Sequence, residues 1–274
     1  MQARTATDRG RGAALTSLIF PTYNPGPRIE RTWDEVARFL RQGAAPWEVL
    51  FVCDGCTDGT SERLVELRSA SPDDIRILSY SPNLGKGHAV RVGLAAAKGD
   101  WRVFTDVDLA YGFDDVAAVA DALRRGADVA IASRTHPQSL VIAPVRMQGY
   151  VYRRHLQSLA FSTMVRWLLP LTQRDTQAGL KGLSARAARL VLPHLHCDGF
   201  EFDCELLTAC ARHGLPIQEV PICVRYDNRH STTNWRSTLR MFRSLWHIRQ
   251  AWPRPLPLPP DWTASPQPVR REAA

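Results

Sequence analysis

Short apolar runs alternate with helical patterns through the first half of the chain, and this alternation restricts the fold more than any other feature. The apolar and β-branched runs predict strands at 15–20, 47–54, 75–79, 101–108 and 128–134. Helical stretches separate them, at 29–42, 60–69, 88–98 and 114–125. Such alternation predicts an α/β fold with a mostly parallel central sheet flanked by helices. Runs without polar alternation, such as VLFVC, indicate strands that are buried on both faces.

The chain has 274 residues, which suits one sizeable domain with short extensions. We expect the main folded domain over 15–228, after a polar, arginine-rich disordered arm at 1–14. An amphipathic helix is expected at 229–252, followed by a proline-rich flexible tail at 253–274. No run of 18 apolar residues predicts a membrane-spanning helix. The start of the chain lacks an apolar leader, so we expect a cytoplasmic protein.

The charge balance points to an anionic partner. Lys and Arg number 35 against 27 Asp and Glu, a formal net charge of +8. Nucleic acid, anionic lipid or a phosphorylated substrate would each fit, and charge alone does not choose among them. Cys53 and Cys56 form a CxxC pair without the further ligands of a zinc site, so ordinary thiols are favoured over a redox motif.

Polar clusters follow three of the predicted strands. They are PTYNPG at 21–26, DGCTDGT at 54–60 and DVD at 106–108. Ligands of open α/β sheets sit beyond the carboxyl ends of the strands. Each cluster alone is typical of turns and helix caps, but three clusters at one edge of one sheet predict a functional site.

Asp106 and Asp108 alternate within the predicted strand 101–108, which places both carboxylates on one face. Carboxylates side by side repel each other unless a cation lies near them. Oxygen ligands suit Mg²⁺ or Mn²⁺, and Mg²⁺ is usually held by one or two carboxylates plus substrate phosphates. A solvated loop pair is the alternative. The apolar run before Asp106 favours the metal, because an unpaired charge there is costly.

Gly85, Lys86 and Gly87 open a predicted helix. Their backbone N–H groups and the lysine either face a phosphate or form a plain turn. The GxxxxGK[ST] pattern of a Walker loop is absent.

Two later segments suggest a membrane surface. In 235–250, Trp235, Leu239, Phe242 and Trp246 share one helical stripe opposite arginines, which is typical of a helix in a bilayer interface. A terminal helix that faces the core is the alternative. The stretch 145–171 is apolar around most of its circumference and fits either a buried helix or one lying along a bilayer.

The order of several segments resembles that of the inverting glycosyltransferases of family 2, which have the GT-A fold. These segments are PTYN (21–24), CDGCTDGT (53–60), NLGKGHAVRVGLAAAKGD (83–100), TDVDL (105–109) and ASR (132–134). RDTQAGLK (174–181) and GFEFDCELL (199–207) resemble segments of the dolichyl- and polyprenyl-phosphate glucose and mannose synthases. The resemblance covers about residues 15–250.

The resemblance implies a role for each matching residue. A nucleotide sugar of the UDP-glucose or GDP-mannose type would contact Pro21, Tyr23, Asn24, Asp54, Lys86, Asp106 and Asp108. Asp106 and Asp108 would also bind the divalent ion, Mg²⁺ or Mn²⁺. The catalytic residues would be Arg134, which neutralises phosphate, Gln177, which lines the site, and Asp203, at the position where many members carry a base. The acceptor phosphate would meet Arg134, Arg146, Arg153 and Arg225.

The acceptor decides what Asp203 has to do. An alcohol needs a general base, whereas a phosphate monoester, with a second pKa of about 6, is already largely dianionic. Asp203 then orients its neighbours, or forms a solvated helix start with Glu205.

We therefore expect a metal-dependent hexosyltransferase acting on a polyprenyl phosphate at the cytoplasmic face of a membrane, with an anionic membrane surface as a partner. The alternatives are a soluble glycosyltransferase that acts on a hydroxyl and, more remotely, a basic anion- or lipid-binding module without catalysis. No nucleic-acid-binding motif is present.

Overall fold

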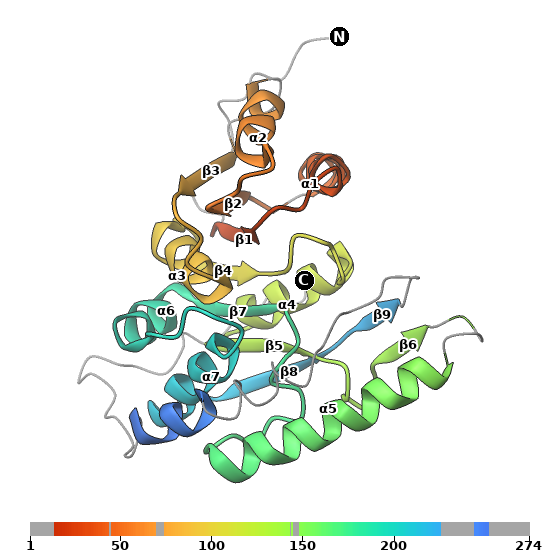
Figure 1. Ribbon diagram of the computed structural model, residues 1–274, viewed down its shortest axis with the longest axis vertical. Coiled ribbons are helices and arrows are strands. Elements are labelled where there is room, and N and C mark those ends of the chain that lie inside the picture. The colour runs from red at the N-terminus through yellow and green to blue at the C-terminus, as the bar shows by residue number, and fades with distance from the viewer. Residues whose placement is uncertain are drawn as a thin grey trace, which may run out of the picture.

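The computed structural model describes residues 14–43, 45–69, 74–142, 144, 148–225 and 244–251. Its central sheet has seven strands in the order β3-β2-β1-β4-β7-β5-β8 (Figure 1). Parallel pairs join β1 (Thr16–Thr22) to β2 (Trp47–Asp54) and β4 (Trp101–Phe104), and β2 to β3 (Ile75–Tyr80). A second, two-stranded sheet pairs β6 (Leu140–Ile142) with β9 (Cys223–Arg225) in parallel.

One strand in the middle of the described sheet runs the other way. β7 (Lys181–Ser184) is antiparallel to β4 and to β5 (Val129–Ser133), and β8 (Ile217–Pro221) is parallel to β5. The first residue of β7 therefore lies at the same edge as the last residues of the parallel strands. The predicted α/β fold with a mostly parallel sheet is confirmed.

Helices cover both faces of the sheet. Their bounds are α1 (Arg28–Gln42), α2 (Thr60–Ser69), α3 (Lys86–Ala96), α4 (Phe113–Arg124), α5 (Gln148–Leu168), α6 (Ala185–Val191) and α7 (Phe202–Arg212), with a 3-10 helix η2 (Leu192–His194) and a further helix over 244–251. α1, α2 and α4 bury side chains in one core layer. α3, α6, α7, the end of α5 and helix 244–251 bury theirs in the other.

The elements predicted in the first half match the structure closely, except at the end of β4. This strand ends at Phe104, and the predicted extension to residue 108 is wrong. Residues 106–109 form a turn, in which the N–H of Leu109 donates to the carbonyl oxygen of Asp106 and Leu109 has a positive φ of 53°. The strand alternation that was expected to align Asp106 and Asp108 is therefore absent.

The expected terminal segments fall mainly outside the described residues. This holds for 1–13, for most of the helix expected at 229–252 and for the tail at 253–274. The part that is described, 244–251, is helical, and Leu245 and Ile248 are buried in the core. Trp246 on the same helix is exposed. Among the described helices, none has the length and apolar character needed to cross a bilayer.

A buried carboxylate near the start of β2 bonds to residues of β1, of β3 and of the loop after α3. It lies at the edge of the sheet where the parallel strands begin. Glu48 Oε1 accepts hydrogen bonds from Ser17 Oγ at 2.6 Å and from the N–H of Lys98 at 2.5 Å. Arg76 Nη1 donates to Oε2 at 3.2 Å. Burial raises the pKa of Glu48, but these three hydrogen bonds outweigh it, so the pKa lies below its ordinary value. Glu48 is therefore held ionised in the folded protein.

We predict that Glu48→Gln lowers the free energy of unfolding at pH 7 by about 1–3 kcal/mol, because an amide cannot satisfy all three donors. A folded pKa below the unfolded value means that Glu48 stabilises the fold at pH values above its unfolded pKa of about 4.3. That contribution disappears as the pH falls through the folded pKa, so the variant and the unaltered protein should converge in acid. Urea unfolding at several pH values measures this.

Glu66→Gln is the matched control, because Glu66 forms an exposed ion pair with Arg63 and such pairs contribute about 1 kcal/mol or less. Equal losses in the two variants, or a loss at Glu48 that does not change with pH, would contradict the interpretation.

Candidate active site

The side chains singled out in the sequence converge on the carboxyl edge of the sheet. Asp54 ends β2, Asp106 follows β4 and Arg134 follows β5. Lys86 begins α3 at the end of the loop that leaves β3, and Asp203 lies in the first turn of α7. The predicted convergence of strand-end clusters is thus observed.

Hydrogen bonds between side chains and backbone join the loops after β1 and β2. Asn24, which has a positive φ of 42°, exchanges hydrogen bonds with Thr57: its Oδ1 accepts from the Thr57 N–H and its Nδ2 donates to Thr57 Oγ1. The N–H of Gly26 donates to Asp58 Oδ2. Asn tolerates this backbone conformation better than most residues. Pro21 is buried within β1 and Tyr23 is exposed beside these loops, and their contact with a nucleotide stays a prediction.

Asp54 is buried and uses its carboxylate to build the neighbouring loop. Oδ1 accepts from the N–H of Leu84 at 2.8 Å, and Oδ2 accepts from the N–H of Gly85 and from Asn83 Nδ2, both at 2.9 Å. The residue therefore fixes the entry into α3 and with it the position of Lys86. Its contact with a nucleotide stays a prediction.

The glycines on either side of Lys86 serve packing. A Cβ at Gly87 would lie 2.5 Å from the carbonyl oxygen of Cys197, and one at Gly85, where φ is 114°, would lie 2.4 Å from that of Asp198. The N–H of Gly87 donates to this Asp198 oxygen at 2.7 Å. The Gly85 and Gly87 amides both bond within the protein, which favours a plain turn over a phosphate cradle for these two groups. The predicted contact of Lys86 with a phosphate stays a prediction.

Four charges of alternating sign cross the site, and we call them the charge chain: Asp106, Lys86, Asp203 and Lys181. Lys86 Nζ lies 2.6 Å from Asp106 Oδ1 and 4.0 Å from Asp203 Oδ2. Lys181 Nζ donates to Asp203 Oδ1 at 2.7 Å and also to the carbonyl oxygen of Ala178. Burial lowers the pKa of Lys86, but the carboxylates of Asp106 and Asp203 outweigh it and hold this pKa above its ordinary value.

The side chains of the charge chain become more buried from Asp106 toward Lys181, whose side chain is 0% exposed. Asp203 is also buried, so its interpretation as part of a solvated helix start is wrong. Glu205 is buried as well, and its Oε2 accepts from the backbone N–H groups of His196 and Cys197. The first turn of α7 thereby holds both the charge chain and the loop against which Gly87 packs.

A bare backbone is needed where Asp106 meets the loop before β7. A Cβ on Gly179 would lie 2.1 Å from Asp106 Oδ2. The N–H of Gly179 donates to the hydroxyl of Tyr111, whose pKa burial raises to about 12. Asp108 Oδ1 caps the same turn by accepting from the N–H of Ala110. The two acidic side chains therefore lie on one tight turn rather than on one face of a strand.

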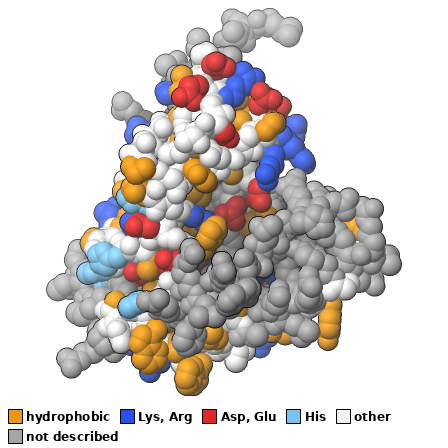
Figure 2. All heavy atoms as spheres, viewed as in Figure 1, with side chains coloured by type: hydrophobic (Ala, Val, Ile, Leu, Met, Phe, Trp, Pro, Cys, Tyr) orange, Lys and Arg blue, Asp and Glu red, His pale blue; other side chains and the backbone are white. Residues whose placement is uncertain are grey.

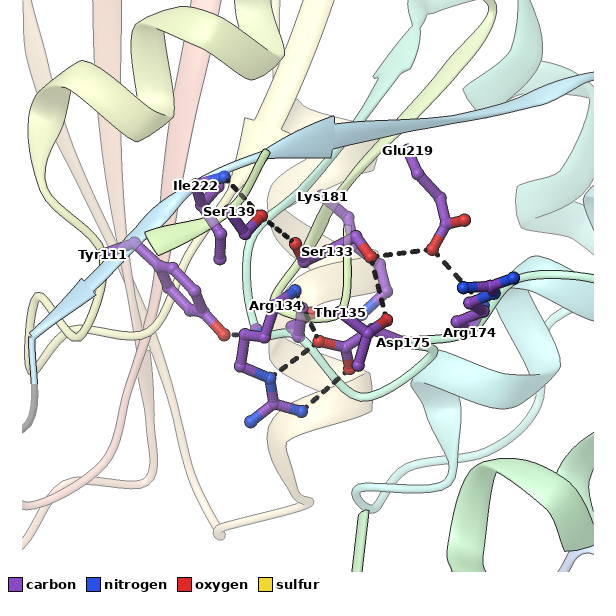
Figure 3. A network of polar contacts seen from close by, with 12 residues as sticks. Tyr111, Ser133, Arg134, Thr135, Ser139, Arg174, Asp175, Lys181, Glu219 and Ile222 are labelled. Atoms are coloured by element: carbon purple, nitrogen blue, oxygen red, sulfur yellow. Dashed lines mark hydrogen bonds and ion pairs between the residues drawn. The ribbon is translucent and has the colours of Figure 1, made fainter. Parts of the chain in front are cut away.

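Arg134 forms a bidentate pair with Asp175 (Figure 3). Its Nε donates to Oδ2 at 2.7 Å and its Nη2 to Oδ1 at 2.8 Å, while its backbone N–H also reaches Oδ2. Burial raises the pKa of Asp175, but the bonds from Arg134 hold it below its ordinary value. Arg134 was expected to face a substrate phosphate, and the structure shows that this part of its guanidinium holds the loop before β7.

Figure 3 also shows how the neighbouring loops are joined. Glu219 Oε1 accepts from Ser133 Oγ at 2.8 Å and from the N–H of Arg174 at 3.3 Å. Ser139 Oγ donates to the carbonyl oxygen of Ser133 and accepts from the N–H of Ile222. These hydrogen bonds tie the loop after β5 to β8 and to the loop before β7.

Three expected phosphate-binding arginines cannot be placed at the site. Arg146 lies outside the described residues. Arg153 lies on α5 and Arg225 ends β9, and the positions of their side chains are not among those described. Gln177 is placed beside α7, where its Nε2 donates to Cys204 Sγ at 3.2 Å.

The Cys53 and Cys56 thiols lack the lowered pKa that is typical of a reactive CxxC pair. Burial raises the pKa of Cys53 to about 12 and also raises the pKa of Cys56, so neither thiol readily forms the reactive thiolate. Cys56 Sγ donates to the carbonyl oxygen of Thr22. In the described part of the chain, no group of three or more His, Cys, Asp or Glu side chains is arranged to hold a metal ion.

Sequence reasoning gave no role to Lys181, Asp175 or Tyr111. Lys181 stands in AGLKGLS, a run of apolar and small residues where a lysine is costly unless it is paired. That context was a signal that the lysine has a buried carboxylate partner, although spacing alone does not name Asp203 as the partner.

The α/β sheet, with its acidic turn after β4 and its lysine-containing carboxyl edge, is that of a nucleotide-sugar-dependent glycosyltransferase with the GT-A fold. The model of Glycosyl transferase family 2 matches residues 17–179. This match covers more than half of the chain, and the chain belongs to that family.

Curated relatives match along most of the chain. The dolichyl-phosphate β-glucosyltransferase of Drosophila melanogaster is 33% identical over 245 residues, covering 85% of this chain and 73% of the relative. The enzyme of the same name from Saccharomyces cerevisiae is 29% identical over 255 residues, covering 86% and 74%. The human enzyme is 29% identical over 245 residues, covering 85% and 74%.

Among solved structures, glucosyl-3-phosphoglycerate synthase from Mycobacterium tuberculosis in complex with phosphoglyceric acid aligns with a TM-score of 0.59 at 19% identity. The alignment covers 89% of this chain and 82% of that one. A complex of the same synthase with Mn²⁺, uridine-diphosphate and glucosyl-3-phosphoglycerate aligns with a TM-score of 0.57 at 21% identity, over the same shares of the two chains. At these identities the likeness concerns the fold.

We predict that Lys181→Met destabilises the protein by about 3–5 kcal/mol, because it leaves the buried Asp203 carboxylate without its closest counter-charge. Adding Asp203→Asn to Lys181→Met should recover part of that loss, since neither charge then remains. Urea unfolding of the single and double variants gives the coupling energy.

Lys98→Met is the matched control, because Lys98 is exposed and such changes usually stay within about 0.5 kcal/mol. Additive losses at Lys181 and Asp203 would contradict the pairing.

Proposed function

We propose that this enzyme transfers a hexose from a nucleotide sugar to a polyprenyl phosphate at the cytoplasmic face of a membrane, with inversion at the anomeric carbon. The observation that carries the proposal is the pairing of Asp203 with Lys181 in the buried part of the charge chain. An alcohol acceptor needs a base that can take its proton. A carboxylate held between two lysines is poorly suited to that task, whereas a dianionic phosphate acceptor does not require it.

The relatives support this acceptor and indicate the sugar. The curated proteins that match most of the chain are named dolichyl-phosphate β-glucosyltransferases. Solved structures that share the fold hold UDP-glucose. We therefore propose a donor of the UDP-glucose type, with GDP-mannose as the alternative to test. The base and ribose would lie against Pro21, Tyr23, Asn24 and Asp54, where the loops after β1 and β2 are joined.

The residues present fit a divalent ion held jointly with the donor. Asp106 and Asp108 lie on one turn at the carboxyl edge and supply hard oxygen ligands. Within the described residues they are not joined by a third ligating side chain. Two carboxylates completed by substrate phosphates are the usual way in which proteins hold Mg²⁺. A bound Mg²⁺ or Mn²⁺ would neutralise the charge of the leaving nucleoside diphosphate.

The protein's own cations act around this position. Lys86 is held at the edge by the Asp54-bound loop and by the carboxylates of Asp106 and Asp203. It lies where the diphosphate of the donor would arrive, and its raised pKa keeps it protonated. Asp203, which is paired with the buried Lys181, orients Lys86 from the protein interior. The pair of Arg134 with Asp175 fixes the loop that carries Gln177. Attack of the acceptor phosphate oxygen on the anomeric carbon and departure of the diphosphate then require no proton transfer.

We predict that Asp108→Asn removes most of the transferase activity while the unfolding temperature stays within about 2–4 °C of that of the unaltered protein. Excess chelator should have the same effect on the unaltered enzyme, and added Mg²⁺ or Mn²⁺ should restore turnover. Binding of Mn²⁺ in the presence of UDP, followed by electron paramagnetic resonance, should weaken in the variant.

Asp114→Asn is the matched control, since Asp114 is an exposed carboxylate at the start of α4. Full turnover in chelator, or in Asp108→Asn, would exclude the proposed ion site.

We predict that radiolabelled UDP-glucose and a short-chain polyprenyl phosphate give a labelled product that is extracted into organic solvent. The same donor with free glycans or small alcohols should give no transfer above hydrolysis, because Asp203, at the position where many family members carry a base, is paired with Lys181. Nucleotide sugars should be tested in parallel, GDP-mannose among them. Transfer to hydroxyl acceptors but never to polyprenyl phosphate would instead identify a soluble family 2 glycosyltransferase.

A further inference from the structure

The outward face of α5 carries large aromatic and aliphatic side chains in contact with solvent. Trp167 is 76% exposed and Tyr152 is 66% exposed, and Leu159 is also exposed. Val165 and Leu168 on the other side of the helix are buried in the core. Among the side chains described on α5, those near its end anchor it in the core, while three large apolar ones face outward, and soluble proteins rarely leave a large apolar area uncovered.

A second helix extends this surface at the end of α5. Arg249 Nη1 donates to the carbonyl oxygen of Leu168 at 2.9 Å. Leu245 and Ile248 of helix 244–251 are buried in the same core layer as Val165 and Leu168. Trp246 of that helix is 47% exposed. We call the exposed set Tyr152, Leu159, Arg166, Trp167 and Trp246 the α5 surface.

The α5 surface lies at one end of the molecule. Figure 1 shows α5 at the end opposite α2, with helix 244–251 beside its last turns. In Figure 2, hydrophobic side chains lie exposed along the lower margin, at the end where Figure 1 draws α5. The acidic and basic side chains of α2 occupy the other end.

The segments that form this surface lack acidic residues. The sequence contains no Asp or Glu between Asp128 and Asp175, and none between Asp227 and Asp261. Arginines occur repeatedly in both stretches, among them the exposed Arg166 and Arg249. Aromatic side chains combined with positive charge and without negative charge match a bilayer interface that contains anionic lipids.

The α5 surface is also close to the active site along the chain. α5 ends at Leu168, and the loop that follows reaches Asp175, the partner of Arg134, and then Gln177 and Lys181. A bilayer that contacts the end of α5 would therefore lie near the loop that closes the acceptor side of the site.

We propose that the α5 surface docks the enzyme on an anionic bilayer. Trp167, Tyr152 and Trp246 enter the headgroup region, while Arg166 and Arg249 pair with lipid phosphates. This proposal follows the bilayer alternative for 145–171 and adds helix 244–251 as a supplementary contact, while the membrane role expected for 235–250 stays a prediction, since most of that helix lies outside the described residues. The surface is argued from exposure and charge, and its use in catalysis rests on the proposed function.

The experiment uses the full chain and vesicles of phosphatidylcholine with and without phosphatidylglycerol. We expect sedimentation with the anionic vesicles, weakening as salt rises because the charges are screened. Trp167→Ser combined with Trp246→Ser should lower the partition coefficient about tenfold or more. Val65→Ser is the matched control, because Val65 on α2 is 60% exposed at the other end of the molecule.

Two charge-reversal variants isolate the electrostatic contribution to vesicle binding. Arg166→Glu should weaken binding to anionic vesicles several-fold more than Arg68→Glu, which changes an exposed arginine of α2. Equal effects in the two members of either pair would overturn the docking surface. A dimer in solution that the tryptophan variant dissociates would also overturn it, since the face would then bind a second copy.

Turnover distinguishes this proposal from the proposed function. The tryptophan variant should keep its activity on a water-soluble, short-chain polyprenyl phosphate and lose it on the same acceptor embedded in vesicles. Vesicle binding through the α5 surface without any transfer to polyprenyl phosphate would support the docking surface and refute the proposed acceptor. Loss of turnover on the soluble acceptor would show that the surface serves the catalytic site, and would overturn the docking proposal.

Discussion

The buried ion pair between Lys181 and Asp203 is the interaction on which the arrangement of the site depends. It joins the first residue of β7 to the first turn of α7. Charges taken out of water are costly unless they are paired in good geometry. The pair therefore fixes how α7 sits on the sheet and, through Lys86, how the start of α3 faces Asp106.

This dependence explains why glycines stand at two positions of the carboxyl edge where main chains approach each other closely. Gly87 lets the start of α3 contact the loop at Cys197, and Gly179 lets the loop before β7 contact the Asp106 carboxylate. Gly87 adjoins Lys86 along the chain and Gly179 contacts Asp106, so the two glycines flank this ion pair. The arrangement of the charge chain thus depends on close approach of main chains. The oppositely charged side chains fill the space between these main-chain segments.

The first half of the fold follows from local sequence, because each strand is a short apolar run and each helix has its own pattern. The ends of the parallel strands had to meet at one edge, so Asp54, Asp106 and Arg134 were correctly brought together. β7 was beyond such reasoning, since KGLS is too short to have a period and its direction is set by tertiary pairing. The turn at Asp106–Leu109 was missed for a related reason: alternating Asp residues look extended until the positive φ of Leu109 is known.

Partners at long sequence distance were the other limit. The bidentate bond between Arg134 and Asp175 joins residues in two separate motifs, and each motif suggested a substrate contact by itself. Asp54 was likewise expected to face a nucleotide, while both of its oxygens bond to the loop before α3. A sequence shows which polar groups are unusual for their context, and the fold decides whether they satisfy one another.

The reversed direction of β7 has a consequence for how such an enzyme can diversify. β5 ends and β7 begins at the carboxyl edge, so residues 134–180 leave the sheet and return to it at the same side. The two stems of this segment are joined by Arg134 and Asp175, and β6 within it pairs with β9. Its exposed surface can therefore vary without altering the register of β1, β2 and β4, provided that the stem pair and the pairing of β6 with β9 are kept.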